Sequence, residues 1–286
     1  MALNREYLVR QAVMDDWDQL SRILLDENGF AHRHLDWRTP LEWLGFPPYF
    51  VIEFNGQVES VLACPPDPPG IGWIRFFSGG KLIPHKQAWS LLWENVRCFF
   101  QRQKGITVCA ITNQYWFREI LESSNFQSHQ QIVMLTWQGS VFPRSELLPG
   151  LNLRRMENAD IPNVVDVDRS AFDIIWQNSE QALQKALSLA SVVTVAEMDG
   201  RIVGYQLSTT NLIGGHLARL AVFPEFQGRG IGRTMVADVI QQFSDRRIFT
   251  ISVNTQSDNL ASLSLYEKLG FRETGERFPV FEYQVL

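Results

Sequence analysis

The sequence reads Gln227-Gly228-Arg229-Gly230-Ile231-Gly232-Arg233 between a strand-like run and a helix-like run, with three glycines in five positions. Upstream, the pattern from Leu217 to Val222 predicts a half-buried strand, which Pro224 closes. The glycines therefore begin a helix, whose free backbone N–H groups and positive dipole end suit a phosphate or a pyrophosphate. The helix itself is predicted from apolar residues on one face, namely Met235, Val236, Val239, Ile240 and Phe243.

Three kinds of anionic ligand compete for this loop. A dinucleotide site has Gly-x-Gly-x-x-Gly after the first strand and an acidic residue about 20 positions later, whereas this loop has Gly-x-Gly-x-Gly, lies late in the chain and lacks that acidic residue. A P-loop requires Gly-Lys-Ser/Thr, which is absent. The run Gln-x-x-Gly-x-Gly at 227–232 resembles the acyl-CoA signature of the GNAT superfamily of N-acyltransferases. A glycine-rich turn that binds no ligand is the structural alternative.

A second motif lies downstream of the loop. Phe249–Val253 alternates like a strand, Asp258 can cap the next helix, and Gly270 stands where a helix usually ends. The second motif makes the resemblance more specific than one motif alone and extends it over about residues 151–286. The string from Asn259 through Leu265-Tyr266 to Gly270-Phe271 resembles the GNAT pattern Asn-x-x-Ala-x-x-Leu-Tyr-x-x-x-Gly-Phe, with Ser262 in place of the alanine.

The two halves of the chain match at a shift of 144 residues. Asn55-Gly56 and Asp199-Gly200 both read as hairpin turns between alternating apolar runs. Further along, Asn125-Phe126 parallels Gly270-Phe271 at a shift of 145. A run of matches at one shift indicates a duplicated domain. The other matched positions are Val9-Arg10 with Leu153-Arg154, Asp16 with Asp160, Leu20 with Val164, and Arg75 with Arg219.

The duplication predicts two tandem GNAT-like domains of the α/β class (mixed α+β), with largely antiparallel central sheets flanked by helices. We expect a degenerate GNAT-like domain at 1–140, a linker at 141–150 and an acyl-CoA-binding GNAT domain at 151–286. The first copy lacks the glycine signature, because Ser78-Gly79-Gly80-Lys81-Leu82-Ile83-Pro84 stands opposite it and Pro84 interrupts the helix start. Leu121 stands opposite Tyr266.

Tryptophan is concentrated in the first half of the sequence. Side chains of this kind could line a substrate pocket or an interdomain face, or they could simply pack in the core. The first half contains Trp17, Trp37, Trp43, Trp73, Trp89, Trp93, Trp116 and Trp137, and the second half contains only Trp176.

Composition limits the other possibilities. The net charge of −5 argues against general affinity for nucleic acid and is compatible with a cationic amine substrate. No apolar run reaches the length of about 18 residues that indicates a membrane span, and the N-terminus has no apolar signal core. We expect a cytoplasmic protein without a metal or a membrane partner, with a homodimer left open. Three cysteines without metal spacing, Cys64, Cys98 and Cys109, are expected to be buried free thiols.

The resemblance implies acetyl-CoA as the co-substrate. In this superfamily the sheet splays open beside the fourth strand, here about His216–Val222, and the next strand, about Phe249–Val253, leaves the gap. The pantetheine arm would pair with the fourth strand, and backbone N–H groups would hold the thioester carbonyl as its charge develops. The residues expected to bind the coenzyme are Leu220, Ala221, Val222, Gln227, Gly228, Arg229, Gly230, Ile231, Gly232, Arg233 and Asn259.

The proposed reaction also needs two proton transfers, one to the departing thiolate and one from the incoming ammonium group. Tyr266 matches the tyrosine of the family and is the expected acid for the departing thiolate, because an unperturbed phenol has a pKa of about 10. Fixing the sulfur, or plain packing, is the alternative. His216 is the candidate base, because imidazole titrates near neutrality and a member of the superfamily has a histidine at the matching strand position. It could instead form a local hydrogen bond, and a bulge would change which residues share its face. Arg219 could meet an acidic acceptor or a neighbouring helix, and its counterpart Arg75 favours a structural role.

The acceptor site is expected to involve the loop Phe172–Trp176. Asp173 could hold an ammonium group or cap a helix, and Trp176 could wall the site or bind a cation over its face. We expect an N-acetyltransferase that moves an acetyl group from acetyl-CoA to a primary amine of a small molecule or a peptide N-terminus, by direct attack in a ternary complex. A non-catalytic acyl-CoA sensor or interaction protein is the alternative. A dinucleotide-dependent oxidoreductase is a third reading, against which the glycine spacing speaks.

Overall fold

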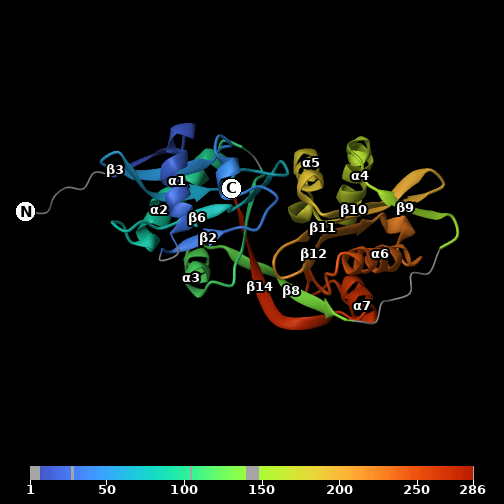
Figure 1. Ribbon diagram of the computed structural model, residues 1–286. Coiled ribbons are helices and arrows are strands. Elements are labelled where there is room, and N and C mark those ends of the chain that lie inside the picture. Colours follow the sequence, from blue (N-terminus) through green and yellow to red (C-terminus); the bar gives the residue numbers. More distant parts are fainter. Residues whose placement is uncertain (1–6, 27–28, 104, 140–147, 286) are drawn as a thin grey trace, which may run out of the picture. The chain divides into compact units, whose positions relative to one another are not determined.

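The computed structural model describes residues 7–26, 29–103, 105–139 and 148–285 (Figure 1). The chain forms two compact units: unit 1 comprises Met1–His129 with Pro279–Leu286, and unit 2 comprises Gln130–Phe278. Most of the expected linker at 141–150 lies outside the described residues, so the expected domain boundaries stay a prediction. Pro279–Leu286 belong to unit 1, because the end of the chain pairs with a strand of that unit.

Unit 2 is built around strands β9 to β13. The strands follow the order β9-β10-β11-β12-β13, after which β8 (Gln127–Gln138) continues the sheet. All neighbours are antiparallel except β12 and β13, which run parallel. The elements are β9 (Leu151–Arg155), α4 (Ile161–Ala171), the short helix η4 (Ile174–Trp176), α5 (Glu180–Leu189), β10 (Val192–Met198), β11 (Arg201–Thr210), β12 (Gly215–Val222), the short helix η5 (Pro224–Phe226), α6 (Ile231–Asp245), β13 (Thr250–Gln256) and α7 (Leu260–Lys268).

Helices cover both faces of this sheet. Figure 1 shows α4 and α5 on one side of β10–β12, and α6 and α7 on the other. The apolar side of α6 is buried because it packs on the strands, which confirms the helical face expected from the sequence. Its buried residues include Met235, Val236, Val239, Ile240 and Phe243.

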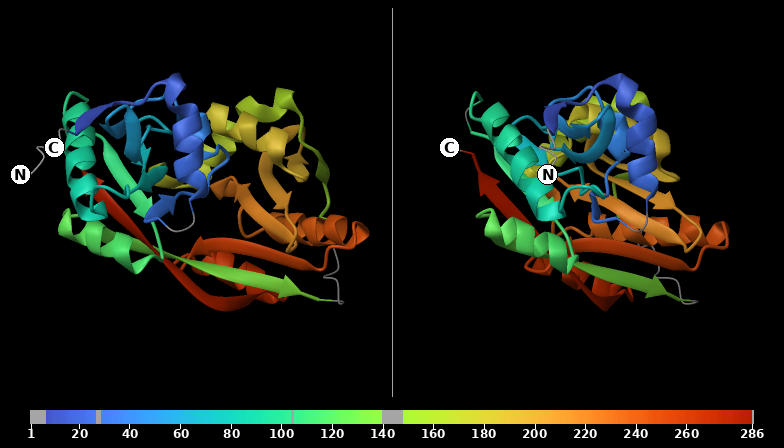
Figure 2. Two further views of the ribbon diagram at one scale, coloured as in Figure 1. Left: turned by 60° about the vertical axis from the view of Figure 1, so that its left-hand side comes forward. Right: turned by 90° about the vertical axis from the view of Figure 1, so that its left-hand side faces the viewer.

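Unit 1 contains a five-stranded sheet in the order β1-β3-β4-β6-β2. Its strands β5 and β7 pair in parallel, and β7 also pairs antiparallel with the end of β14 (Arg272–Gln284), from Val280 to Gln284. In Figure 2 the red end of the chain runs beside the green and teal segments of this unit. The elements are β1 (Leu8–Gln11), the short helix η1 (Met14–Asp16), α1 (Trp17–Leu25), β2 (Ala31–Arg33), the short helix η2 (Pro40–Trp43), β3 (Tyr49–Phe54), β4 (Gln57–Ala63), β5 (Ile71–Trp73), β6 (Phe76–Ser78), α2 (His85–Phe100), β7 (Thr107–Ile111) and α3 (Tyr115–Ser123).

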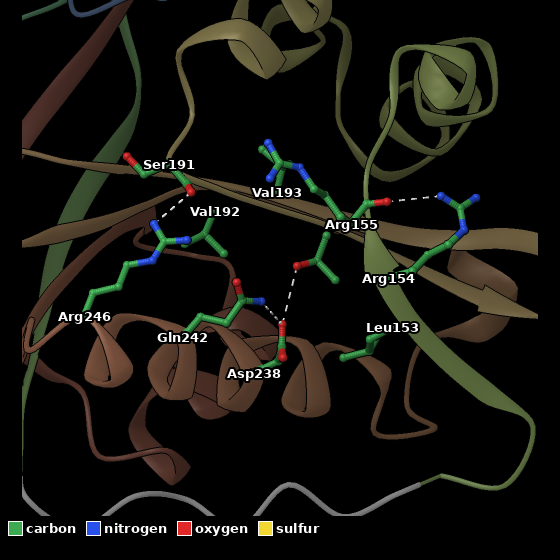
Figure 3. Close-up of a pocket in the computed structure, with 10 residues that line it drawn as sticks. Leu153, Arg154, Arg155, Ser191, Val192, Val193, Asp238, Gln242 and Arg246 are labelled. Carbon is green, nitrogen blue, oxygen red and sulfur yellow. Dashed lines mark hydrogen bonds between the residues drawn. The ribbon is translucent and has the colours of Figure 1, made fainter.

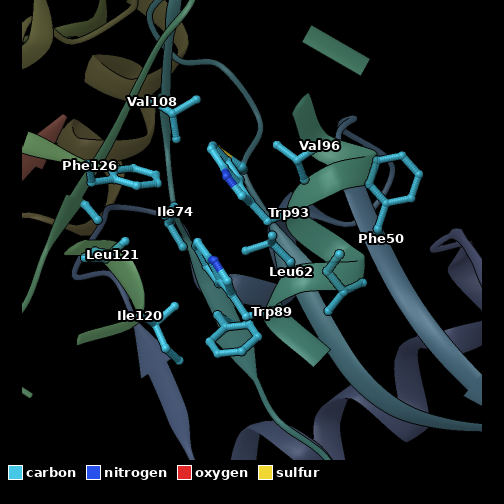
Figure 4. Packing of buried hydrophobic residues seen from close by; sticks show 14 of the residues in the cluster. Phe50, Leu62, Ile74, Trp89, Trp93, Val96, Val108, Ile120, Leu121 and Phe126 are labelled. Carbon is cyan, nitrogen blue, oxygen red and sulfur yellow. The ribbon is translucent and has the colours of Figure 1, made fainter. Parts of the chain in front are cut away.

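Tryptophans form part of the core of unit 1. Trp89 and Trp93 on α2 stack on each other with ring centroids 5.6 Å apart, and both are buried. Figure 4 shows them among Leu62, Ile74 and Phe126. Large aromatic rings contribute much of the apolar area that a small core can bury. Core packing is therefore the observed role of these two tryptophans, as one of the sequence interpretations held.

The two units repeat the same ion cluster. In unit 1, Arg10 binds Asp16 at 2.7 Å and Glu53 at 2.7 Å. In unit 2, 144 residues later, Arg154 binds Asp160 at 2.7 Å and Glu197 at 3.1 Å. The hairpin residues Asn55 and Asp199 also share φ of 51°, and the following glycines share φ of 76°. Identical contacts at one shift show that the two halves are copies of one structural plan.

Strand β2 of unit 1 carries a buried histidine. His32 is 3% exposed and stacks on Phe117 with centroids 4.3 Å apart. Burial lowers its pKa to about 4, and burial with the nearby charge of Arg75 also lowers the pKa of His34. A histidine held neutral inside a protein favours unfolding once the solution is acidic enough to protonate it.

We expect His32→Phe to reduce the acid sensitivity of unit 1. The folded pKa lies below the unfolded value of about 6.5, so stability is complete above that value and is lost as the pH falls from 6.5 toward 4. Between pH 7 and pH 5 this loss is about 2 kcal/mol in the free energy of unfolding. Urea unfolding followed by tryptophan fluorescence measures it, because all tryptophans except Trp137 and Trp176 lie in unit 1. An unchanged pH dependence in the variant would contradict the assignment.

Candidate functional site

The glycine loop connects β12 to α6 through η5. Gly228 has φ of 74° and Gly230, the N-cap of α6, has φ of 88°, a region that side chains with a Cβ rarely enter. Thr234 N donates to Gly230 O at 3.0 Å. The amides of Ile231, Gly232 and Arg233 precede this bond and lack a helical acceptor by the geometry of a helix start. The loop thus presents three N–H groups and the positive end of the helix dipole, as the sequence predicts.

Polar side chains of the loop bind its own backbone. Gln227 Nε2 donates to Val222 O at 3.0 Å, and Arg229 donates to Glu225 O at 2.9 Å. The guanidinium of Arg229 also lies 4.9 Å from the ring centroid of Phe226. Arg233 is exposed in the first turn of α6. Gln227 therefore ties the loop to the strand, and Arg233, like Arg229, is exposed to solvent.

Strand β12 has one free edge next to the loop. It pairs with β13 only at Gly215–Leu217, and beyond this point its described strand partner is β11 alone. Phe223 N donates to Val203 O, and ladder bonds alternate along an antiparallel pair. Leu220 and Val222 therefore turn their N–H and C=O groups toward the free edge. Ala221 turns its groups toward β11, so Leu220 and Val222 are the two residues of the expected three that face the free edge.

The equivalent edge in unit 1 is closed. Strand β6 pairs with β4 on one side and with β2 on the other, with Ala31 opposite Ser78 and Arg33 opposite Phe76. The chain between α1 and β3 provides β2, whereas the chain between α4 and β10 in unit 2 forms η4 and α5. Among the described residues, the free edge beside a glycine loop thus belongs to unit 2.

Arg219 is part of a buried ion pair. Its Nη2 lies 2.6 Å from Asp168 Oδ2 on α4 and donates to Trp176 O at 2.7 Å. Tyr205 donates to the same carboxylate oxygen, and Asn178 N donates to the other at 2.8 Å. The pair fixes α4 and the following loop to β12. The sequence interpretation that favoured a structural role, through a neighbouring helix, is therefore correct. In unit 1 Arg75 binds Asp36 at 2.9 Å.

His216 lies where β12 and β13 still pair. Its Nδ1 is 2.9 Å from Ser252 Oγ, and burial lowers the pKa of the imidazole. The ladder with β11 skips Ala218, which is the bulge that the sequence reading allowed. Because of this bulge, His216 lies on the face of Arg219 and not on that of Leu220, which packs toward α6. His216 is a neutral imidazole at neutral pH, and it makes the local hydrogen bond considered as the alternative.

Tyr266 lies on α7, inside the core of unit 2. It is 4% exposed and belongs to the cluster that contains Leu217 and Val253, the last pair of the parallel ladder. Burial raises the pKa of its phenol above the ordinary value, so the hydroxyl stays protonated at neutral pH. Asn259 caps α7, since its Oδ1 accepts from Ser262 N at 3.1 Å. The expected cap at Asp258 is therefore wrong by one residue.

The acceptor residues suggested by the sequence lie in the loop after α4. Asp173 is exposed at the N-cap of η4, but no side-chain hydrogen bond accompanies that position. Trp176 Nε1 donates to Gln130 Oε1 at 3.0 Å, so its indole is held in place. The exposed carboxylate and the fixed ring thus stand three residues apart, at the N-cap and at the last residue of the short helix.

Other chemistry is limited in the part of the chain that the structure describes. No group of three or more His, Cys, Asp or Glu side chains there could hold a metal ion. No helix among the same residues is long and apolar enough to cross a membrane. Cys64, Cys98 and Cys109 are free thiols. Cys98 is exposed on α2, so the expectation of a buried thiol is wrong for this residue.

Known proteins resemble part of this chain in sequence and the whole chain in fold. Residues 163–280 match the family model of the acetyltransferase (GNAT) domain. Mycothiol acetyltransferase of Tsukamurella paurometabola is 38% identical over 82 residues, which span 27% of this chain and 27% of that protein. The ribosomal protein bS18-alanine N-acetyltransferase of Escherichia coli is 25% identical over 118 residues, 41% of this chain and 78% of that protein. A tandem GNAT protein from the clavulanic acid biosynthesis pathway shares the fold over 98% of each chain, with 14% identity and a TM-score of 0.65.

We expect Asp168→Asn to destabilise unit 2 strongly. The substitution leaves the buried Arg219 guanidinium without its counter-ion, which costs about 3 kcal/mol or more in the free energy of unfolding. Asp166→Asn is the matched control, because Asp166 is exposed on the same helix. Urea unfolding followed by circular dichroism compares the two variants. Equal stabilities would show that the ion pair does not support the fold.

Proposed function

We propose that unit 2, in which residues 163–280 match the family model of the acetyltransferase (GNAT) domain, transfers an acetyl group from acetyl-CoA to a primary amine. The observation that carries this proposal is the free edge of β12 directly beside the amide-rich start of α6. A pyrophosphate and an extended amide-containing arm require these two features in this order. The resemblance of the sequence motifs supports the same ligand.

The coenzyme would use the loop and the strand together. Its pyrophosphate would accept hydrogen bonds from the amides of Ile231, Gly232 and Arg233, where the helix dipole favours negative charge. Its pantetheine arm would pair with the outward backbone groups of Leu220 and Val222, as an added strand does. Arg233 can add a charge-assisted contact from solvent. Gln227 donates a hydrogen bond to the carbonyl oxygen of Val222 and thereby fixes the position of this strand edge.

The reaction needs no covalent enzyme intermediate. A neutral amine attacks the thioester carbonyl, the C–N bond forms, and the collapse of the tetrahedral intermediate breaks the C–S bond. Outward N–H groups of β12 stabilise the oxyanion, and the departing thiolate takes a hydrogen bond or a proton from Tyr266. His216, neutral because of its lowered pKa, would accept the proton that the incoming ammonium loses.

The acceptor class is proposed as a primary amine. Mycothiol acetyltransferase and the ribosomal protein bS18-alanine N-acetyltransferase are named for a small molecule and for a protein alanine, so both small amines and peptide N-termini fit. Asp173 and Trp176 lie in the loop that Arg219 and Asp168 anchor to β12. An exposed carboxylate and a fixed indole in one loop suit a cationic amine. A non-catalytic acyl-CoA sensor would bind the coenzyme equally well and release no thiol.

We expect Gly230→Val to weaken acetyl-CoA binding about tenfold or more, because one lost charge-assisted hydrogen bond already costs this much. Gly200→Val is the matched control, since Gly200 has a similar positive φ of 76° but lies in the β10–β11 turn. Isothermal titration calorimetry should also give one coenzyme per chain, because β2 fills the equivalent edge of unit 1. Unchanged affinity in Gly230→Val, or two bound molecules, would contradict the assigned site.

Tyr266→Phe should lower kcat roughly 100-fold and leave the Kd of acetyl-CoA unchanged, because general acid catalysis acts on the leaving group and not on coenzyme binding. Thiol release with a panel of primary amines measures the rate. Tyr283→Phe is the control, since Tyr283 packs against the core of unit 1. A normal rate in Tyr266→Phe would remove the acid role. Absence of thiol release in the unmodified protein would favour the sensor.

A further inference from the structure

A polar cavity of about 250 Å³ lies within unit 2, between β9, β10 and α6. Arg155 on β9, Arg246 after α6, and Asp238 and Gln242 on α6 line it. Figure 3 shows Asp238 and Gln242 on α6, and Arg246 just after it, extending toward the strand of Val192 and Val193. The sheet order places β11 between this cavity and β12, so the cavity is separate from the proposed coenzyme edge.

Opposite charges line this cavity without neutralising each other. Neither Arg155 nor Arg246 comes within 4.0 Å of the Asp238 carboxylate, and neither forms an ion pair elsewhere among the described residues. Arg246 Nη1 donates to Ser191 O at 2.9 Å, which holds the guanidinium at the cavity. Burial raises the pKa of Asp238. A half-buried carboxylate and two unpaired guanidinium groups therefore share one hollow.

A chain of hydrogen bonds ends on Asp238. Ser208 Oγ donates to Gln206 Oε1 at 2.7 Å, and Gln206 Nε2 donates to Thr194 Oγ1 at 3.0 Å. Thr194 Oγ1 then donates to Asp238 Oδ2 at 3.4 Å, and Gln242 Nε2 donates to the same oxygen at 2.7 Å. Every donor in the chain points toward the carboxylate. Such an aligned chain polarises its members and stabilises the charged form of the acid.

The fold does not require these polar groups. At the shift of 144 residues, Thr194, Gln206 and Ser208 correspond to Phe50, Leu62 and Cys64 of unit 1, which lie in its apolar core. The pairing of Phe50 with Leu62 matches the pairing of Thr194 with Gln206. Burying an amide and two hydroxyls costs free energy unless each is hydrogen-bonded. Because unit 1 closes the same place with apolar side chains, the polar chain of unit 2 points to a ligand.

We propose that this cavity binds a small zwitterion of the α-amino acid type, whose carboxylate meets Arg155 and Arg246 and whose ammonium group meets Asp238. A zwitterion pairs both kinds of charge at once, whereas an anion or a cation alone leaves the other unpaired. The volume lies below the range of about 300–1,000 Å³ usual for drug-sized ligands, so the occupant is small. This inference goes beyond acyl transfer and does not depend on it.

Calorimetry on the full chain without acetyl-CoA tests the proposal with glycine, L-serine, L-aspartate and L-glutamate as probes. We expect saturable binding of at least one of them. Its N-acetyl derivative, which lacks the ammonium group, and its amide, which lacks the carboxylate, should each bind about tenfold more weakly or worse, since each loses a charge-assisted hydrogen bond. Absence of binding at millimolar concentration throughout the panel would overturn the proposal, and so would equal affinity for either derivative.

Variants separate the cavity from the acceptor site of the proposed transferase. Asp238→Asn and Arg155→Gln should weaken the amino acid about tenfold while acetyl-CoA affinity stays unchanged. Asp245→Asn is the matched control, because Asp245 is exposed on the same helix and does not line the cavity. Arg155 is exposed, so its variant keeps the test valid even where Asp238→Asn disturbs folding. Unaltered amino acid binding in Arg155→Gln would overturn the proposal, whatever the coenzyme result.

Discussion

The backbone of β12 beyond Leu217 must satisfy its hydrogen bonds on the side that faces away from β11. Backbone polar groups that leave water without a partner cost free energy comparable to a lost hydrogen bond. Unit 1 meets this constraint with its own strand β2. Unit 2 satisfies one carbonyl with Gln227 and leaves the remaining groups of Leu220 and Val222 available. Unit 1 thus satisfies this strand edge with its own chain, whereas unit 2 leaves the edge open to a ligand.

The ion pair of Arg219 with Asp168 holds the other side of this edge in place. A buried ion pair adds little net stability over apolar packing, but breaking it is costly. Here the guanidinium also binds Trp176 O and lies 3.6 Å from the ring centroid of Phe172. Both residues belong to the loop proposed to meet the acceptor. The pair therefore positions a loop relative to β12, which apolar side chains could not do with the same directionality.

Local patterns explain how much of the fold and of the site the sequence predicts. The helical period of α6, the glycines at its start and the hairpins at Asn55 and Asp199 depend on neighbours in sequence, and the structure contains all of them. The sequence does not distinguish Asp258 from Asn259 as the cap of α7, because both residue types suit that position, and the structure has Asn259 there. The sequence could not predict the ion-pair partner of Arg219, because Asp168 lies 51 residues away along the chain. The hydrogen-bond chain that ends on Asp238 also joins residues that lie far apart in the sequence.

Strand β2 shows how the segment after the first helix differs between the two units. Its three residues, Ala31–Arg33, have no strand signal of their own and become a strand because β6 offers a free edge. The segment between the first helix and the next long strand can cross to that edge or can form a helix such as α5, but not both. In unit 2 the segment forms η4 and α5, which keeps the edge free and places Asp173 and Trp176 in the loop after α4. The free edge and the loop with Asp173 and Trp176 therefore occur together in unit 2, as the proposed coenzyme and acceptor sites require.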